Sequence, residues 1–247
     1  MYNLDNGFTR MNFAVVVVGC GGTGGFVAES LCQLLPHNAT PVLVDHDRVE
    51  ERNLARQNFF RGDIGKLKSE ALALRLSRQY GRAVAYSMYP IAMTEIARPG
   101  LIVGCVDNGR ARRDIASKVN AVWWVDAGNG ENYGQVLIGN SAYGCFDEEK
   151  GVCNGLPLPT IQRPDLLNAV PKQQPDCAQV AEQGPTINQA MAAIVVEVVR
   201  RIIEGICPWM QLYLDMEAGT LHPVLAMPEE VAKIIGKDKI QVRQETK

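Results

Sequence analysis

The stretch that decides the fold is VVVVGCGGTGG, residues 15–25. Its four valines form a continuous run of β-branched apolar residues, which predicts a strand buried on both faces, as in a parallel sheet. The run leads into Gly19, Gly21 and Gly24, spaced as G-x-G-x-x-G, and then into apolar residues at helical spacing. Such glycines allow a tight turn, a phosphate against bare backbone, and close packing of helix on strand. The stretch therefore predicts a strand–turn–helix unit whose helix N-terminus binds a nucleotide phosphate.

The composition is that of an ordinary globular protein. The chain has 247 residues, of which 47% are hydrophobic and 21% charged, with a formal net charge of -2. This near-neutral charge argues against nucleic acid as the main partner, and the apolar runs are too short to span a membrane. The N-terminal residues are polar and carry no secretion signal, and the seven cysteines are scattered. We therefore expect a cytoplasmic protein with reduced thiols, no nucleic-acid partner and no membrane association.

Strands and helices alternate after the glycine-rich turn. Strands are expected at residues 41–45, 84–88, 101–105, 122–126 and 133–139, and helices at 65–80, 110–119 and from 187. No helix separates the strand at 133–139 from its predecessor, so this strand is expected to be antiparallel. A hairpin is expected over 211–224, followed by a charged helix from Pro228. The pattern predicts a Rossmann-like α/β fold, a doubly wound and mostly parallel sheet with an appended antiparallel part.

The whole chain, residues 1–247, is expected to be a single domain with three sections. Residues 1–139 form the nucleotide-binding half, and residues 178–247 supply a helix, a hairpin and a tail. Residues 140–177 contain five prolines and little periodicity, so we expect an irregular crossover loop there. Loops of this length are usually functional or mobile.

Asp45 lies 21 residues beyond Gly24, at the end of the second expected strand. A carboxylate at this spacing binds a ribose hydroxyl in dinucleotide-binding folds. Asp45 is therefore predicted to bind the ribose of the nucleotide; a solvated carboxylate that caps the following loop is the alternative.

Charged side chains follow in the next polar segments. Arg56 and Lys68 lie between the second and third expected strands, and Asp107 comes shortly after the fourth. A hydride-transferring enzyme needs an apolar slot for nicotinamide and has no need of such a set. A nucleoside triphosphate needs these residue types, because cations hold its phosphates and a carboxylate binds Mg²⁺. The set therefore favours a triphosphate over a dinucleotide.

These residues belong to motifs that follow one another in a fixed order. The motifs are Gly19-x-Gly21-Gly22-x-Gly24, Asp45-x-Asp47-x-Val49, Asn53-Leu54-x-Arg56-Gln57, Asp63-Ile64-Gly65-x-x-Lys68 and Asp107-Asn108-x-x-x-Arg112. In this order they resemble the ThiF/MoeB/ubiquitin-activating superfamily over residues 13–140, and more loosely through Cys177-Ala178 and residues 187–190. Gly139 and the motif His222-Pro223-Val224 are most similar to ThiF-type proteins of bacterial PRTRC gene clusters.

The resemblance implies an activity, a partner and a set of site residues. Members of the superfamily bind Mg-ATP and adenylate the C-terminal glycine of a small ubiquitin-like (β-grasp) or sulfur-carrier protein, and they are usually dimers. An acceptor that resembles a conjugating enzyme is one candidate for the step that follows. The implied nucleotide-binding residues are Gly19, Gly21, Gly22, Gly24, Asp45, Asp47, Asn53, Arg56, Gln57, Lys68, Asp107 and Asn108. The implied catalytic residues are Arg56 and Lys68 at the phosphates and Asp107 as the Mg²⁺ ligand.

The cysteines depart from the family pattern. Many relatives hold structural zinc with two C-x-x-C pairs, whereas Cys145 and Cys153 are eight residues apart and Cys177 and Cys207 lie alone. We therefore expect no zinc. Two interpretations of Cys177 stand side by side. It is either a catalytic cysteine that accepts the activated carboxyl group as a thioester, as in some relatives, or a half-buried residue of the crossover loop.

The same residues leave three alternatives to adenylation of a ubiquitin-like protein. An NAD-dependent oxidoreductase would use the same glycine loop, although the charged set argues against it. A non-catalytic scaffold would bind a ubiquitin-like partner without adenylating it. The third alternative is an enzyme that uses ATP to modify a small molecule or a peptide, as some relatives do.

Overall fold

The valine run forms the central strand β1 (Phe13–Val18), and all six of its residues are buried. It pairs in parallel with β2 (Ala39–Val44) on one side and with β4 (Pro99–Gly104) on the other. The structure is a computed structural model that describes residues 13–36, 38–97, 99–119, 122–147, 152–168, 184–236 and 240–243. Because β1 is covered on both faces, its continuous apolar sequence is explained by its central place in the sheet.

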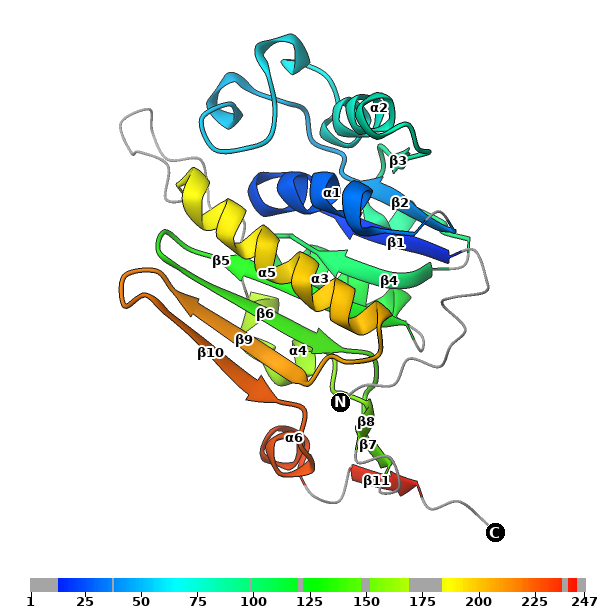
Figure 1. Cartoon of the computed structure of the whole chain (residues 1–247), viewed down its shortest axis with the longest axis vertical. Helices are drawn as coiled ribbons and strands as arrows, with labels where there is room; N and C mark the ends of the chain where they lie inside the picture. Colours follow the sequence, from blue (N-terminus) through cyan, green and yellow to red (C-terminus); the bar gives the residue numbers. More distant parts are fainter. Residues whose placement is uncertain are drawn as a thin grey trace.

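The large sheet has eight strands in the order β10-β9-β6-β5-β4-β1-β2-β3 (Figure 1). Strands β1 to β5 are parallel, whereas β6, β9 and β10 are antiparallel. The remaining strands of this sheet are β3 (Ala85–Ser87), β5 (Trp123–Asn129), β6 (Tyr133–Gly139), β9 (Trp209–Asp215) and β10 (Thr220–Leu225). The predicted fold class, a doubly wound parallel sheet with an antiparallel part, is confirmed.

Helices cover both faces of this sheet. In Figure 1, α1 (Gly22–Leu34) and α5 (Pro185–Ile203) lie in front of the strands, and α3 (Gly109–Lys118) and α4 (Pro159–Gln162) lie behind them. The remaining helices are α2 (Lys68–Tyr80), α6 (Pro228–Ile235), η2 (Glu51–Asn53), η3 (Arg61–Asp63), η4 (Ile91–Met93) and η5 (Pro164–Asn168). Along β1, Val15 and Val17 pack in the core beneath α1, α2 and α5, whereas Val16 packs in the core beneath α3. Among the helices that the structure describes, none is both long and apolar enough to cross a membrane.

The expected crossover loop over residues 140–177 is more ordered than the sequence predicted. Its described part contains β7 (Gly144–Asp147), β8 (Val152–Gly155), α4 and η5, and β7 also pairs with β11 (Ile240–Arg243) in a second, three-stranded sheet. No helix or strand was predicted there, because elements of four or five residues show no detectable periodicity. Pro159 and Pro164 begin α4 and η5, as proline at the first helical position commonly does.

The second helix begins three residues later than predicted. Gly65 has a φ of 84° and closes a turn, so that α2 begins at Lys68. This shift matters for the site, because it places Lys68 in the first turn of α2, directly after the polar segment that follows β2.

Candidate functional site

The carboxyl ends of β2, β1 and β4 lie side by side at one edge of the sheet. The polar segments that follow them carry the glycine motif, Asp45 and Asp107. The chain runs from β1 to β2 and β3 on one side and then crosses to β4 on the other side of β1, so this edge is a topological switch point, where open α/β sheets bind their ligands. The sheet therefore brings together three of the predicted motifs.

Two of the glycines are required by the packing of the turn itself. Gly19 has a φ of 87°, and a Cβ atom there would lie 2.5 Å from the carbonyl oxygen of Cys105. A Cβ atom on Gly24 would lie 1.8 Å from the carbonyl oxygen of Gly19. These positions tolerate no side chain, in agreement with their predicted roles in turn formation and helix packing.

Gly21 is different, because no atom of the described residues would clash with a side chain there. The nearest atom to a Cβ built there is Nε2 of Gln57 at 3.7 Å, an ordinary van der Waals distance. Gln57 is buried, and within the described part of the chain its Oε1 atom has no hydrogen-bond partner. A buried carbonyl oxygen without a partner is costly, so Oε1 indicates a hydrogen-bond donor that this structure does not contain. The bare backbone of Gly21 and the amide of Gln57 thus lie next to each other at the glycine turn, where both can contact a ligand.

The first turn of α1 suits an anion. Gly21 is the N-cap residue and provides no side-chain hydrogen bond, and the first turn carries no acidic residue. The free N–H groups and the positive end of the helix dipole therefore remain available to a phosphate beside Gly21.

Asp45 is buried at the end of β2 and shapes the glycine loop. Its Oδ2 atom accepts a hydrogen bond from the backbone N–H of Cys20 at 2.7 Å, and its Oδ1 atom accepts one from that of Asp47 at 2.8 Å. Burial raises the pKa of Asp45, although Lys68 and the two backbone N–H groups oppose this shift. A carboxylate has about four acceptor positions, so Asp45 can still accept hydrogen bonds from a ligand.

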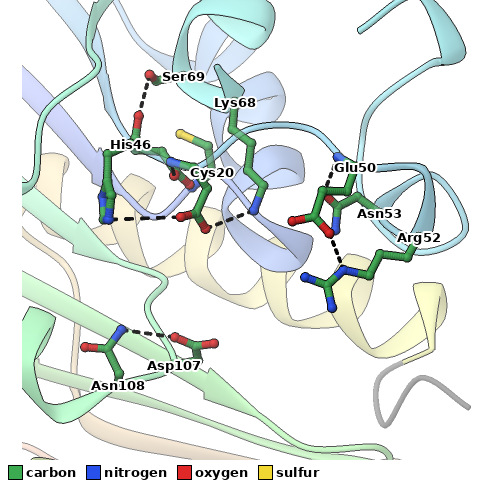
Figure 2. A network of polar contacts seen from close by, with 11 residues as sticks. Cys20, His46, Glu50, Arg52, Asn53, Lys68, Ser69, Asp107 and Asn108 are labelled. Carbon is green, nitrogen blue, oxygen red and sulfur yellow. Dashed lines mark hydrogen bonds and ion pairs between the residues drawn. The ribbon is translucent and has the colours of Figure 1, made fainter. Parts of the chain in front are cut away.

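Lys68 lies beside this carboxylate, with its side chain almost fully buried. Its Nζ atom is 3.1 Å from Oδ2 of Asp47, and its backbone N–H donates to the carbonyl oxygen of Asp47 at 2.8 Å (Figure 2). The hydroxyl of Ser69 reaches the carbonyl oxygens of Asp45 and Ser87 at 2.8 and 2.9 Å. These bonds fasten α2 to the ends of β2 and β3. Ser69 could not be predicted from the sequence, because a single serine in a helix is not distinctive.

Arg56 is half-buried in the segment between η2 and α2. Burial and the neighbouring Arg52 lower its pKa, whereas Asp107 raises it, so Arg56 and Asp107 face the same region. Asn53, also predicted to contact phosphates, is buried, and its Oδ1 atom accepts the backbone N–H of Glu50 at 2.9 Å. In this structure Asn53 orders the segment that carries Arg56, and a phosphate contact by Asn53 stays a prediction.

Asp107 is exposed and follows β4. Asn108 is the N-cap of α3: its Oδ1 atom accepts the backbone N–H of Ala111 at 2.9 Å, and its Nδ2 atom donates to Oδ1 of Asp107 at 3.2 Å (Figure 2). Asn108 therefore orients Asp107, a role that differs from the predicted nucleotide contact. Beneath this loop, Arg112 pairs with the fully buried Asp126 at 3.0 Å.

Asn188 was quoted in a sequence motif without a role, and the structure places it at the site. Its side chain is completely buried and donates to the carbonyl oxygen of Arg56 at 3.1 Å. The available signal was an asparagine within the apolar face of α5, next to Ile187 and before Met191.

Two cysteines and a group of potential metal ligands lie near the glycine turn. Cys177 lies outside the described residues, so its predicted role stays untested. Cys20 and Cys105 are in the turn region, and burial raises the pKa of each well above that of a free thiol. Within the described residues, the group of potential metal ligands that lie close together is Asp45, His46 and Asp47, whose ligand atoms are within 4.8 Å of one another.

The comparisons with known proteins agree with this fold. A family model described as the ThiF family matches residues 10–223. The chain is 38% identical over 102 residues to the mouse (Mus musculus) adenylyltransferase and sulfurtransferase MOCS3, an alignment that covers 38% of this chain and 22% of that protein.

Solved structures with the same fold include MccB of E. coli with ATP and PaaA. For MccB with ATP the TM-score is 0.62 at 17% identity, covering 87% of this chain and 64% of MccB. For PaaA the TM-score is 0.65 at 20% identity, covering 89% of this chain and 75% of PaaA. The chain thus spans about a fifth of the length of MOCS3 and less than two thirds of MccB.

Proposed function

Because this chain belongs to the ThiF family, we propose that it is an ATP-dependent adenylyltransferase. Its substrate is the C-terminal carboxylate of a small ubiquitin-like or sulfur-carrier protein of the β-grasp fold. A carboxylate oxygen attacks the α-phosphorus of ATP, the bond from that phosphorus to the bridging oxygen of the β-phosphate breaks, and pyrophosphate leaves. The product is an acyl-adenylate. Within the family, we place the chain with the ThiF-type proteins of PRTRC gene clusters.

The observation that carries this proposal is that the packing of the described residues does not require a glycine at position 21. Packing explains Gly19 and Gly24, whereas Gly21 faces the amide of Gln57 at ordinary contact distance. MccB, which has this fold, has been solved with ATP. A phosphate against Gly21 would meet bare backbone, the helix N-terminus and an amide that can donate a hydrogen bond.

Each charged side chain contacts a different part of ATP. Asp45 accepts hydrogen bonds from the ribose hydroxyls, while Arg56 holds phosphate oxygens. Lys68, held by Asp47 at 3.1 Å, offsets the negative charge that develops around the α-phosphorus. A carboxylate is already a nucleophile at neutral pH, so no general base is required, and positioning plus charge neutralisation accounts for the chemistry.

Mg²⁺ is the implied metal of this reaction. Asp107 suits it, because its carboxylate is exposed, faces Arg56 and is oriented by Asn108. The ion would neutralise charge on the phosphates of ATP. Asp107 is a hard oxygen ligand of the type that Mg²⁺ prefers.

The experiment that tests the proposal is pyrophosphate exchange into ATP. Purified protein, Mg-ATP, labelled pyrophosphate and a β-grasp protein that ends in glycine should give labelled ATP. The same β-grasp protein without its terminal glycine is the matched control and should give none. If exchange is absent while the β-grasp protein still binds, the chain is a scaffold; if NAD⁺ binds and ATP does not, the oxidoreductase alternative holds.

Cys177 is tested in the same assay. We expect Cys177→Ala to keep pyrophosphate exchange near the wild-type rate, because adenylation needs no thiol. A covalent adduct with the β-grasp protein that is sensitive to reducing agents should form with the wild type and not with this variant. If the wild type forms no such adduct, the thioester step is excluded and the adenylate passes to another acceptor. We also expect a homodimer, which sedimentation equilibrium would show.

A further inference from the structure

Asn188 is a polar residue in an apolar setting. It lies in the first turn of α5 and is 0% exposed, next to the buried residues Ile187, Met191 and Ala192. Burying a carboxamide without hydrogen-bond partners destabilises the folded state. The hydrogen bonds of Asn188 therefore indicate why the residue is there.

These bonds join four parts of the chain. The Nδ2 atom of Asn188 donates to the carbonyl oxygen of Arg56 at 3.1 Å. Its Oδ1 atom accepts from Nδ2 of Asn129, the last residue of β5, at 3.0 Å, and lies 3.4 Å from the hydroxyl of Thr23 in α1. One side chain thus ties α5, the segment that carries Arg56, β5 and the first turn of α1 together.

The absence of a side chain at Gly22 leaves room for the carboxamide of Asn188. A Cβ atom on Gly22 would lie 2.5 Å from Nδ2, 2.6 Å from Cγ and 2.7 Å from Oδ1 of Asn188. Gly22 occupies an x position of G-x-G-x-x-G, where nucleotide binding does not call for glycine. Its place in the motif is explained by the carboxamide that packs against it, so Gly22 and Asn188 form a fitted pair.

We infer that Asn188 is a positioning residue, which fixes the backbone of Arg56 against the glycine loop and acts on the reaction mainly through Arg56. The inference rests on the proposed adenylation. Asn188 is fully buried and cannot touch a ligand itself. Arg56 follows a 3-10 helix in a segment without other regular structure until η3. Its backbone therefore depends on such side-chain bonds, and small misplacements of a catalytic group lower rates steeply.

A kinetic double-mutant cycle tests this inference. Asn188→Ala, Arg56→Ala and the double variant are compared with the wild type in pyrophosphate exchange. We expect Asn188→Ala to lower kcat about tenfold with a smaller change in KM for ATP, and to cause no further loss in the Arg56→Ala background. A wild-type rate for Asn188→Ala, or an equal loss in both backgrounds, would overturn the inference.

Hydrogen–deuterium exchange of the nucleotide-free protein gives a measure that does not need activity. In Asn188→Ala, the peptide that contains Arg56 should exchange about tenfold faster than in the wild type. The matched control is Gln162→Ala, another buried amide, which bonds the carbonyl oxygens of Ile138 and Pro157 far along the chain from Arg56. Unchanged exchange around Arg56 in Asn188→Ala, or equal acceleration in the control, would contradict the inference.

These two measurements separate the inference from the proposed function. Absence of pyrophosphate exchange in the wild type, with faster deuterium exchange around Arg56 in Asn188→Ala, would reject the adenylation and keep the structural role of Asn188. If Asn188→Ala does not fold, Asn188→Ser takes its place in both experiments, since its shorter side chain also loses the bond to Arg56.

Discussion

Two buried carboxylates flank the candidate site, and they are held in different ways. Asp45, at the end of β2, accepts hydrogen bonds from the backbone N–H groups of Cys20 and Asp47 at 2.7 and 2.8 Å. Asp126, in β5, faces the guanidinium group of Arg112 at 3.0 Å. The first carboxylate is held by neutral backbone groups and the second by a buried charge.

This difference predicts different tolerance to change on the two sides of the site. Arg112 also donates to the carbonyl oxygen of Val106 at 2.7 Å, so that the buried pair supports the residue before Asp107. Removing one partner of a buried ion pair leaves an uncompensated charge, whereas removing a carboxylate from backbone N–H groups leaves neutral donors without partners. The stability of the region around Asp107 and Asp126, which we call the Asp107 side, should therefore depend strongly on the single residue Arg112. The stability of the region around Asp45, the Asp45 side, should depend less on any single residue.

The largest expected effect is on stability. Arg112→Ala should lower the free energy of unfolding by about 3–5 kcal/mol, because Asp126 is left buried without its cation. The matched control is Arg110→Ala, an exposed arginine on the same helix, which should change it by less than about 0.5 kcal/mol. Urea denaturation measures both. A loss for Arg112→Ala no greater than the loss for Asp45→Ala would remove the distinction between the two sides.

The next effect is on rate. Lys68→Ala should lower the adenylation rate by about 10²–10³, because its charge meets negative charge that is greatest in the transition state. Lys66→Ala is the control, since Lys66 is exposed and pairs with Asp63 at 3.4 Å. Steady-state pyrophosphate exchange with varied ATP separates kcat from KM. A higher KM with unchanged kcat would place Lys68 in ground-state binding instead.

A smaller effect is expected on ligand affinity. Asp45→Ala should weaken Mg-ATP binding by about 1–3 kcal/mol through the loss of charge-assisted hydrogen bonds to the ribose. Calorimetric titration of the folded variant measures it. As a control, Asp215→Ala removes a carboxylate from the β9–β10 turn and should leave the affinity unchanged. An unaltered affinity in Asp45→Ala would show that Asp45 only shapes the loop.

The last expected effect is a dependence on pH that arises on the Asp126 side. Burial raises the pKa of Asp126 from 3.8 to about 6, against the opposing effect of Arg112. The folded state therefore binds this proton more tightly than the unfolded state, so this residue's contribution to the free energy of unfolding falls as the pH rises from about 4 to 6. Asp126→Asn cannot titrate, and the difference between wild type and variant should change over this interval. Parallel curves from urea denaturation at each pH would contradict the assignment.

The sequence predicted the Asp45 side of the molecule better than the Asp107 side. The valine run, the glycines and Asp45 act through neighbours close in sequence or through the general geometry of parallel strands, so their pattern can be recognised without a structure. Arg112 and Asp126 were not predicted to pair, because their contact depends on how α3 packs against β5.

The roles of individual motif residues were harder to predict than their presence. Gly22 and Asn108 were both assigned to the nucleotide, and these contacts stay predictions; the structure adds that Gly22 packs against Asn188 and that Asn108 caps α3. The contact of Gly22 joins residues 166 positions apart in the chain. No local pattern encodes such a contact, so it becomes visible only once α5 lies beside α1.

The central claim is that the backbone of Gly21 contacts the phosphates of Mg-ATP, and calorimetric titration of the wild type and of Gly21→Ala tests it most directly. Among the described residues, the nearest atom to a Cβ atom at residue 21 is 3.7 Å away, so the variant should fold. We predict saturable binding of Mg-ATP and none of NAD⁺ to the wild type, and loss of Mg-ATP binding in Gly21→Ala. Binding of NAD⁺ in place of Mg-ATP, or wild-type affinity for Mg-ATP in Gly21→Ala, would contradict the account.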